Sequence, residues 1–85
     1  MIDDETHIDG NGVAGLLAEI GGAEMTTVLR TCQSCGDRQP IAAHRAFRGA
    51  GVVLRCPTCH DVAVRIGVHA ERLVVDWRGT YEIAR

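Results

Sequence analysis

The sequence predicts a small α+β fold, in which one short N-terminal helix precedes an antiparallel β-sheet of about four to five strands. Helical periodicity of apolar residues is confined to residues 9–22, and period-two alternation prevails after residue 25. Two Cys-x-x-Cys pairs lie within the strand region, with 20 residues between them. This spacing is typical of a zinc ribbon, a pair of tight turns that bind one metal ion.

The helix is expected to begin within Asp9-Gly10-Asn11-Gly12, because Asp9 or Asn11 can accept hydrogen bonds from its first free amides. Its apolar residues recur at i, i+3, i+4 and i+7, namely Val13, Leu16, Leu17 and Ile20. Gly21-Gly22 is expected to end it. So short a helix is marginal in water, so its apolar stripe must pack on the ribbon or on another subunit. Residues 1–8 show no periodicity and are expected to be mobile.

Strands are expected over residues 26–31, 41–48, 52–55, 62–68 and 73–77, with brief pairing or fraying at 81–85. The last two full strands are expected to form a hairpin that extends the ribbon. The predicted core consists of Leu16, Ile20, Val28, Phe47, Leu54, Val64, Ile66, Val75 and Trp77. We interpret residues 1–24 as an acidic arm with the helix and residues 25–85 as the ribbon, together forming one folding unit.

The candidate metal ligands are the four cysteines, Cys32, Cys35, Cys56 and Cys59. Two Cys-x-x-Cys turns can supply a tetrahedral set of four sulfurs, the geometry that zinc prefers in closed structural sites. After the first pair, Gly36 suits a positive φ, and His60 in the matching place tolerates that region better than most residues. We therefore expect one Zn²⁺ per chain. Because an 85-residue chain builds only a modest core, folding of residues 25–66 is expected to depend on the metal.

Other uses of the cysteines fit the sequence less well. Disulfides need an oxidising compartment, and the acidic start Met1-Ile2-Asp3-Asp4-Glu5 is unlike a signal peptide. Cys56–His60 also matches the attachment motif of c-type haem, which requires export and leaves Cys32 and Cys35 unexplained. A redox dithiol places its first cysteine at a helix N-terminus, whereas residues 61–68 have strand periodicity.

Iron in a rubredoxin-like site remains the alternative metal, because the ligands alone do not distinguish it from zinc. Electron carriers of that type usually enclose the site in aromatic side chains. The chain offers only Phe47, Trp77 and Tyr81. We therefore expect zinc.

Among the polar residues near the cysteines, Arg30 and Arg55 could each donate a hydrogen bond to a thiolate, but solvated side chains are expected. His44 lies between the pairs and is not needed as a ligand. His60 is expected at the surface. The chain has one serine, no lysine and no set of residues with catalytic spacing, so no enzyme activity is predicted.

Charge is distributed unevenly along the chain. Residues 1–24 carry six acidic and no basic side chains, whereas residues 25–85 carry nine arginines against five acidic side chains. Four thiolates and one Zn²⁺ would reduce the +4 of the second part to +2. So small an excess argues only weakly for nucleic acid.

Four features together resemble a family of short, uncharacterised zinc-ribbon proteins from actinobacteria. They are His7-Ile8-Asp9-Gly10-Asn11, Cys32-x-x-Cys35-Gly36, Leu54-Arg55-Cys56-Pro57-x-Cys59 and Asp76-Trp77-Arg78-Gly79. The resemblance covers nearly the whole chain and implies one zinc bound by the four cysteines. It implies no activity.

The sequence as a whole predicts a non-enzymatic, cytoplasmic, zinc-binding protein that presents a surface to another protein or to a second copy of itself. A nucleic-acid-binding ribbon is the main alternative, and an iron-containing redox protein is a further one. No membrane contact is expected, since the longest apolar runs are only a few residues.

Overall fold

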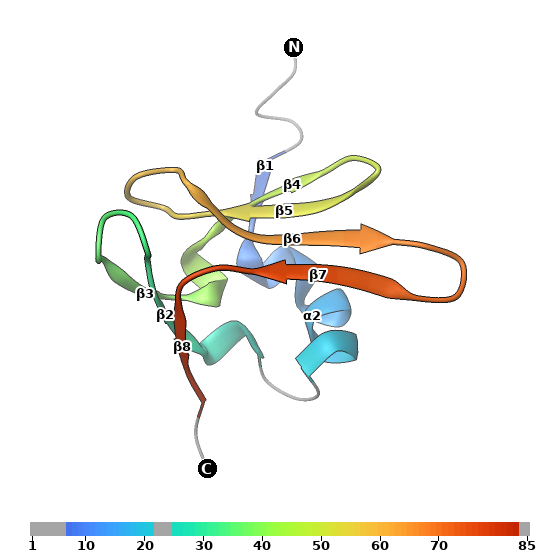
Figure 1. The fold of residues 1–85 in the computed structure, drawn as a ribbon, viewed down its shortest axis with the longest axis horizontal. Coiled ribbons are helices and arrows are strands. Elements are labelled where there is room, and N and C mark those ends of the chain that lie inside the picture. Colours follow the sequence, from blue (N-terminus) through green and yellow to red (C-terminus); the bar gives the residue numbers. More distant parts are fainter. Residues whose placement is uncertain (1–6, 22–24, 84–85) are drawn as a thin grey trace.

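A computed structural model of the chain describes residues 7–21 and 25–83. Their elements are one α-helix, three short 3₁₀ helices and eight strands in two antiparallel sheets (Figure 1). The predicted small α+β fold is confirmed. The expected four to five strands were too few, because three short strands form a second sheet.

The larger sheet has five strands in the order β1-β4-β5-β6-β7. They are β1 (His7–Asp9), β4 (Arg45–Arg48), β5 (Gly51–Arg55), β6 (Val62–Val68) and β7 (Leu73–Trp77). The last three match the predicted strands closely, because they are rich in β-branched and other apolar residues that favour an extended chain. His7 and Ile8 were expected to be mobile, yet they pair with Phe47 and Ala46 of β4. Residues 1–6 lie outside the described residues.

The smaller sheet places β2 (Leu29–Thr31) between β3 (Arg38–Pro40) and β8 (Thr80–Glu82). Two predicted strands proved too long. Residues 25–27 form the 3₁₀ helix η2 (Met25–Thr27), and residues 41–43 form η3 (Ile41–Ala43).

The turn at η3 has a clear physical reason. The Ile41 amide donates to the Val28 carbonyl at 2.9 Å, and the Ile41 side chain is fully buried. The chain must then turn from the smaller sheet into β4 of the larger one. One 3₁₀ turn accomplishes this change of direction, which an extended strand could not.

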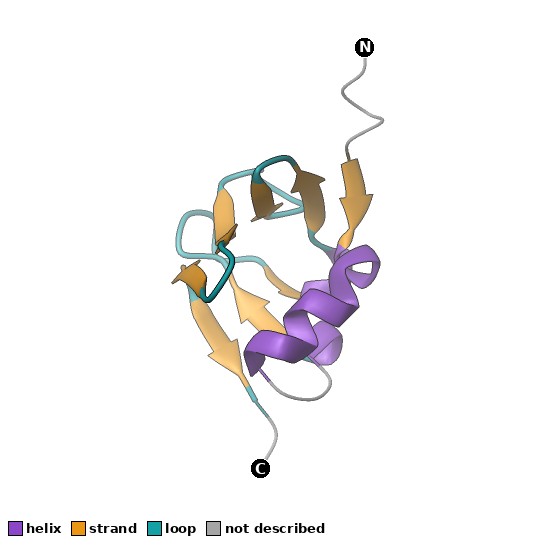
Figure 2. Cartoon of the chain, turned by 90° about the vertical axis from the view of Figure 1, so that its right-hand side faces the viewer, coloured by secondary structure: helices purple, strands orange, loops and turns teal. Residues whose placement is uncertain are grey.

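The helical segment comprises η1 (Gly10–Val13) and α2 (Ala14–Gly21), and it lies across one face of the larger sheet (Figure 2). The predicted stripe is the one that packs inward. Val13 and Leu17 are buried, and Leu16 and Ile20 are partly buried against the same core. No helix of the described residues lies over the other face of the sheet.

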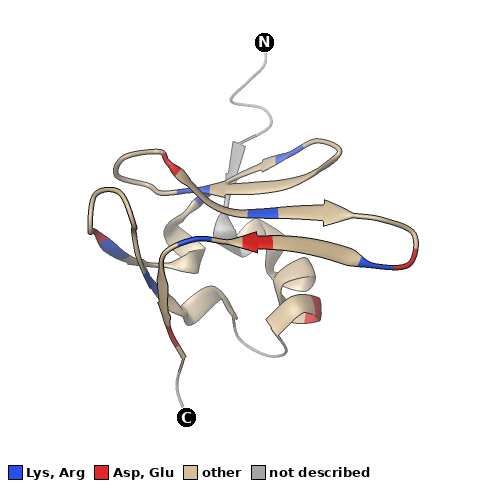
Figure 3. Ribbon diagram, viewed as in Figure 1, with Lys and Arg blue, Asp and Glu red and all other residues tan. Residues whose placement is uncertain are grey.

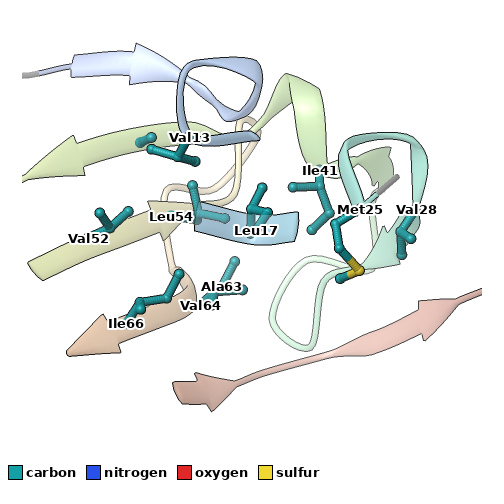
Figure 4. Packing of buried hydrophobic residues seen from close by; sticks show 11 residues of the cluster. Val13, Leu17, Met25, Val28, Ile41, Val52, Leu54, Ala63, Val64 and Ile66 are labelled. Atoms are coloured by element: carbon teal, nitrogen blue, oxygen red, sulfur yellow. The ribbon is translucent and has the colours of Figure 1, made fainter. Parts of the chain in front are cut away.

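The core lies between this helical segment and the larger sheet, and it extends to η2 and η3 (Figure 4). Of the predicted core residues, Val28, Leu54, Val64 and Ile66 are buried, while Leu16, Ile20 and Val75 pack against them and Phe47 is half-buried. The prediction missed seven buried residues, Val13, Leu17, Met25, Ile41, Ala46, Val52 and Ala63. Several of these are small or lie in irregular segments, where periodicity is a weak guide.

The core prediction for Trp77 was wrong, since its side chain is 37% exposed. Trp77 ends the edge strand β7, beyond the centre of the core. Its ring packs edge-on against Tyr81, with centroids 5.2 Å apart and an interplanar angle of 86°. The pair covers the edge of the sheet.

No helix within residues 7–21 and 25–83 is long and apolar enough to cross a membrane.

Leu17 is the buried residue of α2, and truncating it tests how the helix is anchored. We predict that Leu17→Ala lowers the free energy of unfolding by about 2–5 kcal/mol, through lost burial and the cavity left behind. Denaturant titration of the metal-loaded protein measures the change. Leu16→Ala is the matched control, and its loss should be smaller because Leu16 is only partly buried. Equal losses would contradict the packing described above.

Candidate metal centre

The two Cys-x-x-Cys turns have the same backbone geometry although they belong to different sheets. In the first turn, the Cys32 amide donates to the Asp37 carbonyl at 2.8 Å, and the Gly36 amide donates to the Cys32 carbonyl at 3.0 Å. The corresponding bonds of the second turn, from Cys56 to Asp61 and from His60 to Cys56, measure 2.9 and 3.0 Å.

Each turn also contains one residue in the left-handed region, at the place where the sequence predicted it. Gly36 has φ +79° and His60 has φ +69°. This conformation bends the chain so that both sulfurs of a pair lie on the same side of the turn. The His60 side chain is exposed, as expected.

The four sulfurs form one cluster, with all of them within 4.8 Å of one another. The Sγ atoms of Cys32 and Cys59 are 3.6 Å apart, and those of Cys35 and Cys56 are 3.8 Å apart. A tetrahedral ion with metal–sulfur bonds of 2.3 Å requires sulfurs about 3.8 Å apart. A disulfide needs about 2.05 Å. The cluster therefore consists of free cysteines spaced as a tetrahedral metal ion requires.

Backbone amides donate hydrogen bonds to the buried sulfur of each turn. The Ser34 amide donates to Cys32 Sγ, and the Thr58 amide donates to Cys56 Sγ, both at 3.4 Å. Burial raises the pKa of Cys32, but the amides of Cys35 and Ser34 and the neighbouring thiols outweigh it and lower the pKa to about 6.

The pKa values of the exposed cysteines, Cys35 and Cys59, are shifted in the opposite direction. The Asp61 amide lowers the pKa of Cys59, but burial and the sulfurs around it outweigh this and raise that pKa to about 12. The pKa of Cys35 is also raised: burial and the sulfurs of Cys32 and Cys56 outweigh the lowering by the Asp37 amide. One thiolate forms easily, whereas four at this separation repel one another. The full set of thiolates therefore requires a cation between them.

Two hydrogen bonds between side chains tie the turns to each other. Ser34 Oγ of the first turn donates to Asp61 of the second, and Thr58 Oγ1 of the second donates to Asp37 of the first. We call this arrangement the crossed hydroxyl–carboxylate bonds. These bonds are the largest cause that lowers the pKa of each aspartate, so both carboxylates are held ionised.

The sequence analysis overlooked these four residues, although a signal was present. The two segments Cys32–Asp37 and Cys56–Asp61 share the pattern Cys-x-Ser/Thr-Cys-x-Asp. The repeat places a hydroxyl donor and a carboxylate acceptor at the same positions of both turns. Two such turns facing each other can therefore exchange hydrogen bonds.

The expectation of a solvated Arg30 was wrong, because its side chain is only 1% exposed. Its Nε donates to the Arg78 carbonyl at 2.9 Å, one terminal nitrogen lies 3.3 Å from His44 Nε2, and the other donates to Gln33 Oε1. Gln33 in turn donates to Asp61 at 3.0 Å. Arg30 is thus linked to the second cysteine turn through one amide side chain.

The burial of Arg30 follows from its place in the strand. Two residues before Cys32 on β2, it points to the same side as that cysteine. The chain after β7 then closes over it at Gly79, where φ is +88° and a Cβ atom would lie 2.6 Å from the Thr31 carbonyl oxygen. Only glycine fits at this crossing.

His44 is buried beside Arg30 and is not part of the sulfur cluster. Its Nδ1 donates to the Pro40 carbonyl at 2.9 Å, which leaves Nε2 to accept from Arg30. Burial lowers the pKa of His44 and outweighs the raising effect of the hydrogen bond to the Pro40 carbonyl, and the Arg30 charge lowers the pKa a little further. The ring is therefore neutral. Arg55 donates to the His60 carbonyl at 3.0 Å.

A profile of a family of unknown function, DUF6510, matches residues 4–85. The chain belongs to this family. None of the curated proteins and none of the solved structures matches the chain. The membership agrees with the expected uncharacterised family and assigns no activity. The actinobacterial origin and the zinc that the resemblance implied remain predictions.

The crossed hydroxyl–carboxylate bonds should govern how firmly the site retains its metal. We predict that Thr58→Val weakens metal affinity roughly 10-fold to 100-fold, as is typical when support around a metal site is lost. Competition with a chromophoric chelator measures the affinity. Thr58→Ser keeps the hydroxyl and is the matched control, with affinity close to the wild type. Similar losses in both variants would show that the hydroxyl is not responsible.

The neutral state of His44 predicts a pH dependence of stability. In the unfolded chain His44 takes up a proton near pH 6.5, and its folded pKa is lower. The stability that neutral His44 contributes is therefore complete above about pH 6.5 and is lost as the pH falls below it.

Unfolding free energies of the wild type and His44→Gln, compared at about pH 7.5 and 5.5, test this expectation. The difference between the two proteins should shrink at the lower pH, because only the wild type loses the contribution. Protonation of the cysteines acts on both proteins alike and cancels in the comparison. A difference that stays constant would show that His44 is not held neutral.

Proposed function

We propose that the protein is a non-enzymatic, zinc-stabilised binding module of the cytoplasm. One Zn²⁺ bound by Cys32, Cys35, Cys56 and Cys59 would hold the two turns together, and the sheet surface would contact another protein. The observation that carries the metal role is the sulfur cluster, with Sγ separations of 3.6 and 3.8 Å. Free cysteines at these separations are compatible with a reducing compartment.

A structural role for the metal is supported by the composition of the site. Four sulfurs complete a tetrahedron and leave no open position for a water molecule or a substrate. The nearby carboxylates of Asp37 and Asp61 accept hydrogen bonds from side chains and backbone of the turns. Both carboxylates therefore stabilise the cysteine turns. When bound, the ion would neutralise the thiolates, and the residues around it would only fix their positions.

Binding of a protein, and not of nucleic acid, is supported by how the basic residues are used. Arg30 is buried, Arg38 pairs with Glu82 at 2.6 Å, and Arg65 and Arg78 both pair with Asp76 at 2.9 and 3.4 Å. Figure 3 shows the acidic segment of β7 beside the basic segment of β6. Trp77 and Tyr81 pack on each other, so few aromatic rings are available to stack on bases.

Native mass spectrometry of untagged protein, purified without added metal, tests the metal assignment. One zinc per chain with four reduced cysteines is expected. A coloured, iron-loaded protein would support the rubredoxin-like alternative instead. A mass deficit from disulfides would overturn metal binding altogether.

Substitution of a single ligand should abolish the site. We predict that Cys56→Ser loses the metal and unfolds or aggregates, since structural zinc contributes roughly 10–16 kcal/mol in small sites. Metal analysis and circular dichroism measure the two losses. Val53→Ser, a half-buried residue of the preceding strand, is the control and should keep its metal. A Cys56→Ser variant with native metal content would show that Cys56 is not a ligand.

A further inference from the structure

The face of the larger sheet that α2 does not cover carries an open groove of about 620 Å³. It crosses β4 to β7 near the two hairpin turns that join these strands. Its volume lies within the range of about 300–1,000 Å³ that is usual for ligand sites. The cysteine turns do not contribute to it.

Two glycines, Gly51 of β5 and Gly67 of β6, face each other across the floor of the groove. The fold itself requires the first, because a Cβ atom on Gly51 would lie 2.2 Å from the Ile66 carbonyl oxygen. It does not require the second. A Cβ atom on Gly67 would make ordinary contacts, at 3.5 Å from His69 and 3.8 Å from Val74.

No contact among the described residues therefore requires a glycine at position 67. Its φ is not positive, and it is the sixth residue of the seven-residue strand β6. A glycine within a strand lowers stability and contributes no side chain to packing. It commonly marks a site where a ligand or another backbone approaches the strand closely. The His69 ring and Val74 border the groove above Gly67.

The walls of the groove are largely apolar. Phe47 and Val53 are paired neighbours on β4 and β5. Val68 and Val74 flank Gly67 and are 49% and 51% exposed. Large aliphatic side chains grouped around a hollow are typical of a contact surface.

The charges at the groove favour an acidic partner. Its lining includes two guanidinium groups, Arg48 and Arg65, and one carboxylate, Asp76. Arg65 pairs with Asp76 at 2.9 Å, and exposed Arg48 donates to the Gly12 carbonyl at 2.9 Å. With two positive groups against one negative group, the lining has a net charge of +1. Figure 3 shows the basic segment of β6 beside the acidic segment of β7.

We propose that this groove binds an extended, acidic segment of another protein. The segment's backbone would pass over Gly67, an apolar side chain would pack between Val53 and Val74, and a carboxylate would pair with Arg48. The inference rests on the proposed binding function and identifies the surface and the partner chemistry for it. It does not depend on which metal occupies the cysteine site.

The test is a selection from a displayed library of random seven-residue peptides on the full-length, metal-loaded protein. Enriched peptides are expected to be acidic with one or two apolar residues, and their binding should weaken as salt is added. Amide chemical shifts should change around the groove. No enrichment, enrichment of basic peptides, or shifts confined to other surfaces would overturn the proposal.

Two variants make the test specific to the groove. Gly67→Val, which fills the floor, should weaken binding of an enriched peptide by about tenfold or more. Thr80→Val, at an exposed strand position of the smaller sheet, should leave binding unchanged. Native metal content and melting temperature in both variants show that the fold is intact. If Gly67→Val folds normally and binds as tightly as the wild type, the proposal fails.

Other occupants give different results. If deletion of residues 1–6 strengthened peptide binding by about tenfold, the groove would belong to the acidic start of the chain itself, and an external partner would be excluded. A dimer that dissociates on Gly67→Val would assign the groove to a second copy. If the metal-free protein still binds the peptide, the structural role of the metal is overturned and the groove proposal stands. If the metal-loaded protein binds no peptide, the groove proposal is overturned and the metal assignment stands.

Discussion

Mutual repulsion between four thiolates is the constraint on which the rest of this structure depends. The sulfurs lie within 4.8 Å of one another, and the cost of ionising all of them is visible in the pKa of Cys59, raised to about 12 beside a Cys32 lowered to about 6. A divalent cation turns this repulsion into attraction to a common centre. Because one turn follows β2 and the other follows β5, a cation bound there would fasten the smaller sheet to the larger one. An 85-residue chain with a modest core gains from such a fastening.

Around this centre, polar groups are arranged so that the two turns hold each other even before the metal is considered. The crossed hydroxyl–carboxylate bonds connect the turns directly, and Gln33 extends the connection to Arg30. Arg30 is a buried permanent cation. Among the described residues, its nitrogens contact a backbone carbonyl, His44 and Gln33, and no acidic side chain. A tetrathiolate centre with a divalent metal carries a net charge of −2, so such a centre on the same side of β2 would supply the opposite charge that a buried guanidinium needs.

The two faces of the larger sheet serve different purposes. One face packs against the helical segment and forms the core, with Leu17, Leu54 and Val64 fully buried. The other face bears the groove, in which Gly67 contributes no side chain to packing and Val68 and Val74 are exposed. The metal centre lies apart from both. The module therefore separates the part that stabilises the fold from the part that we propose recognises a partner.

The sequence by itself determined the features that depend on local spacing. The Cys-x-x-Cys pairs, the left-handed residues Gly36 and His60, the helix stripe and the strands β5, β6 and β7 all follow from short-range pattern and backbone chemistry. Only the tertiary structure decided what depends on residues far apart in the chain. Arg30 is buried because Gly79, 49 positions later, crosses over it, and Trp77 is exposed because its strand lies at the edge of the sheet. The crossed hydroxyl–carboxylate bonds likewise arise only when two turns face each other, since a hydrogen bond between distant residues depends on how the chain folds back and not on their spacing in the sequence.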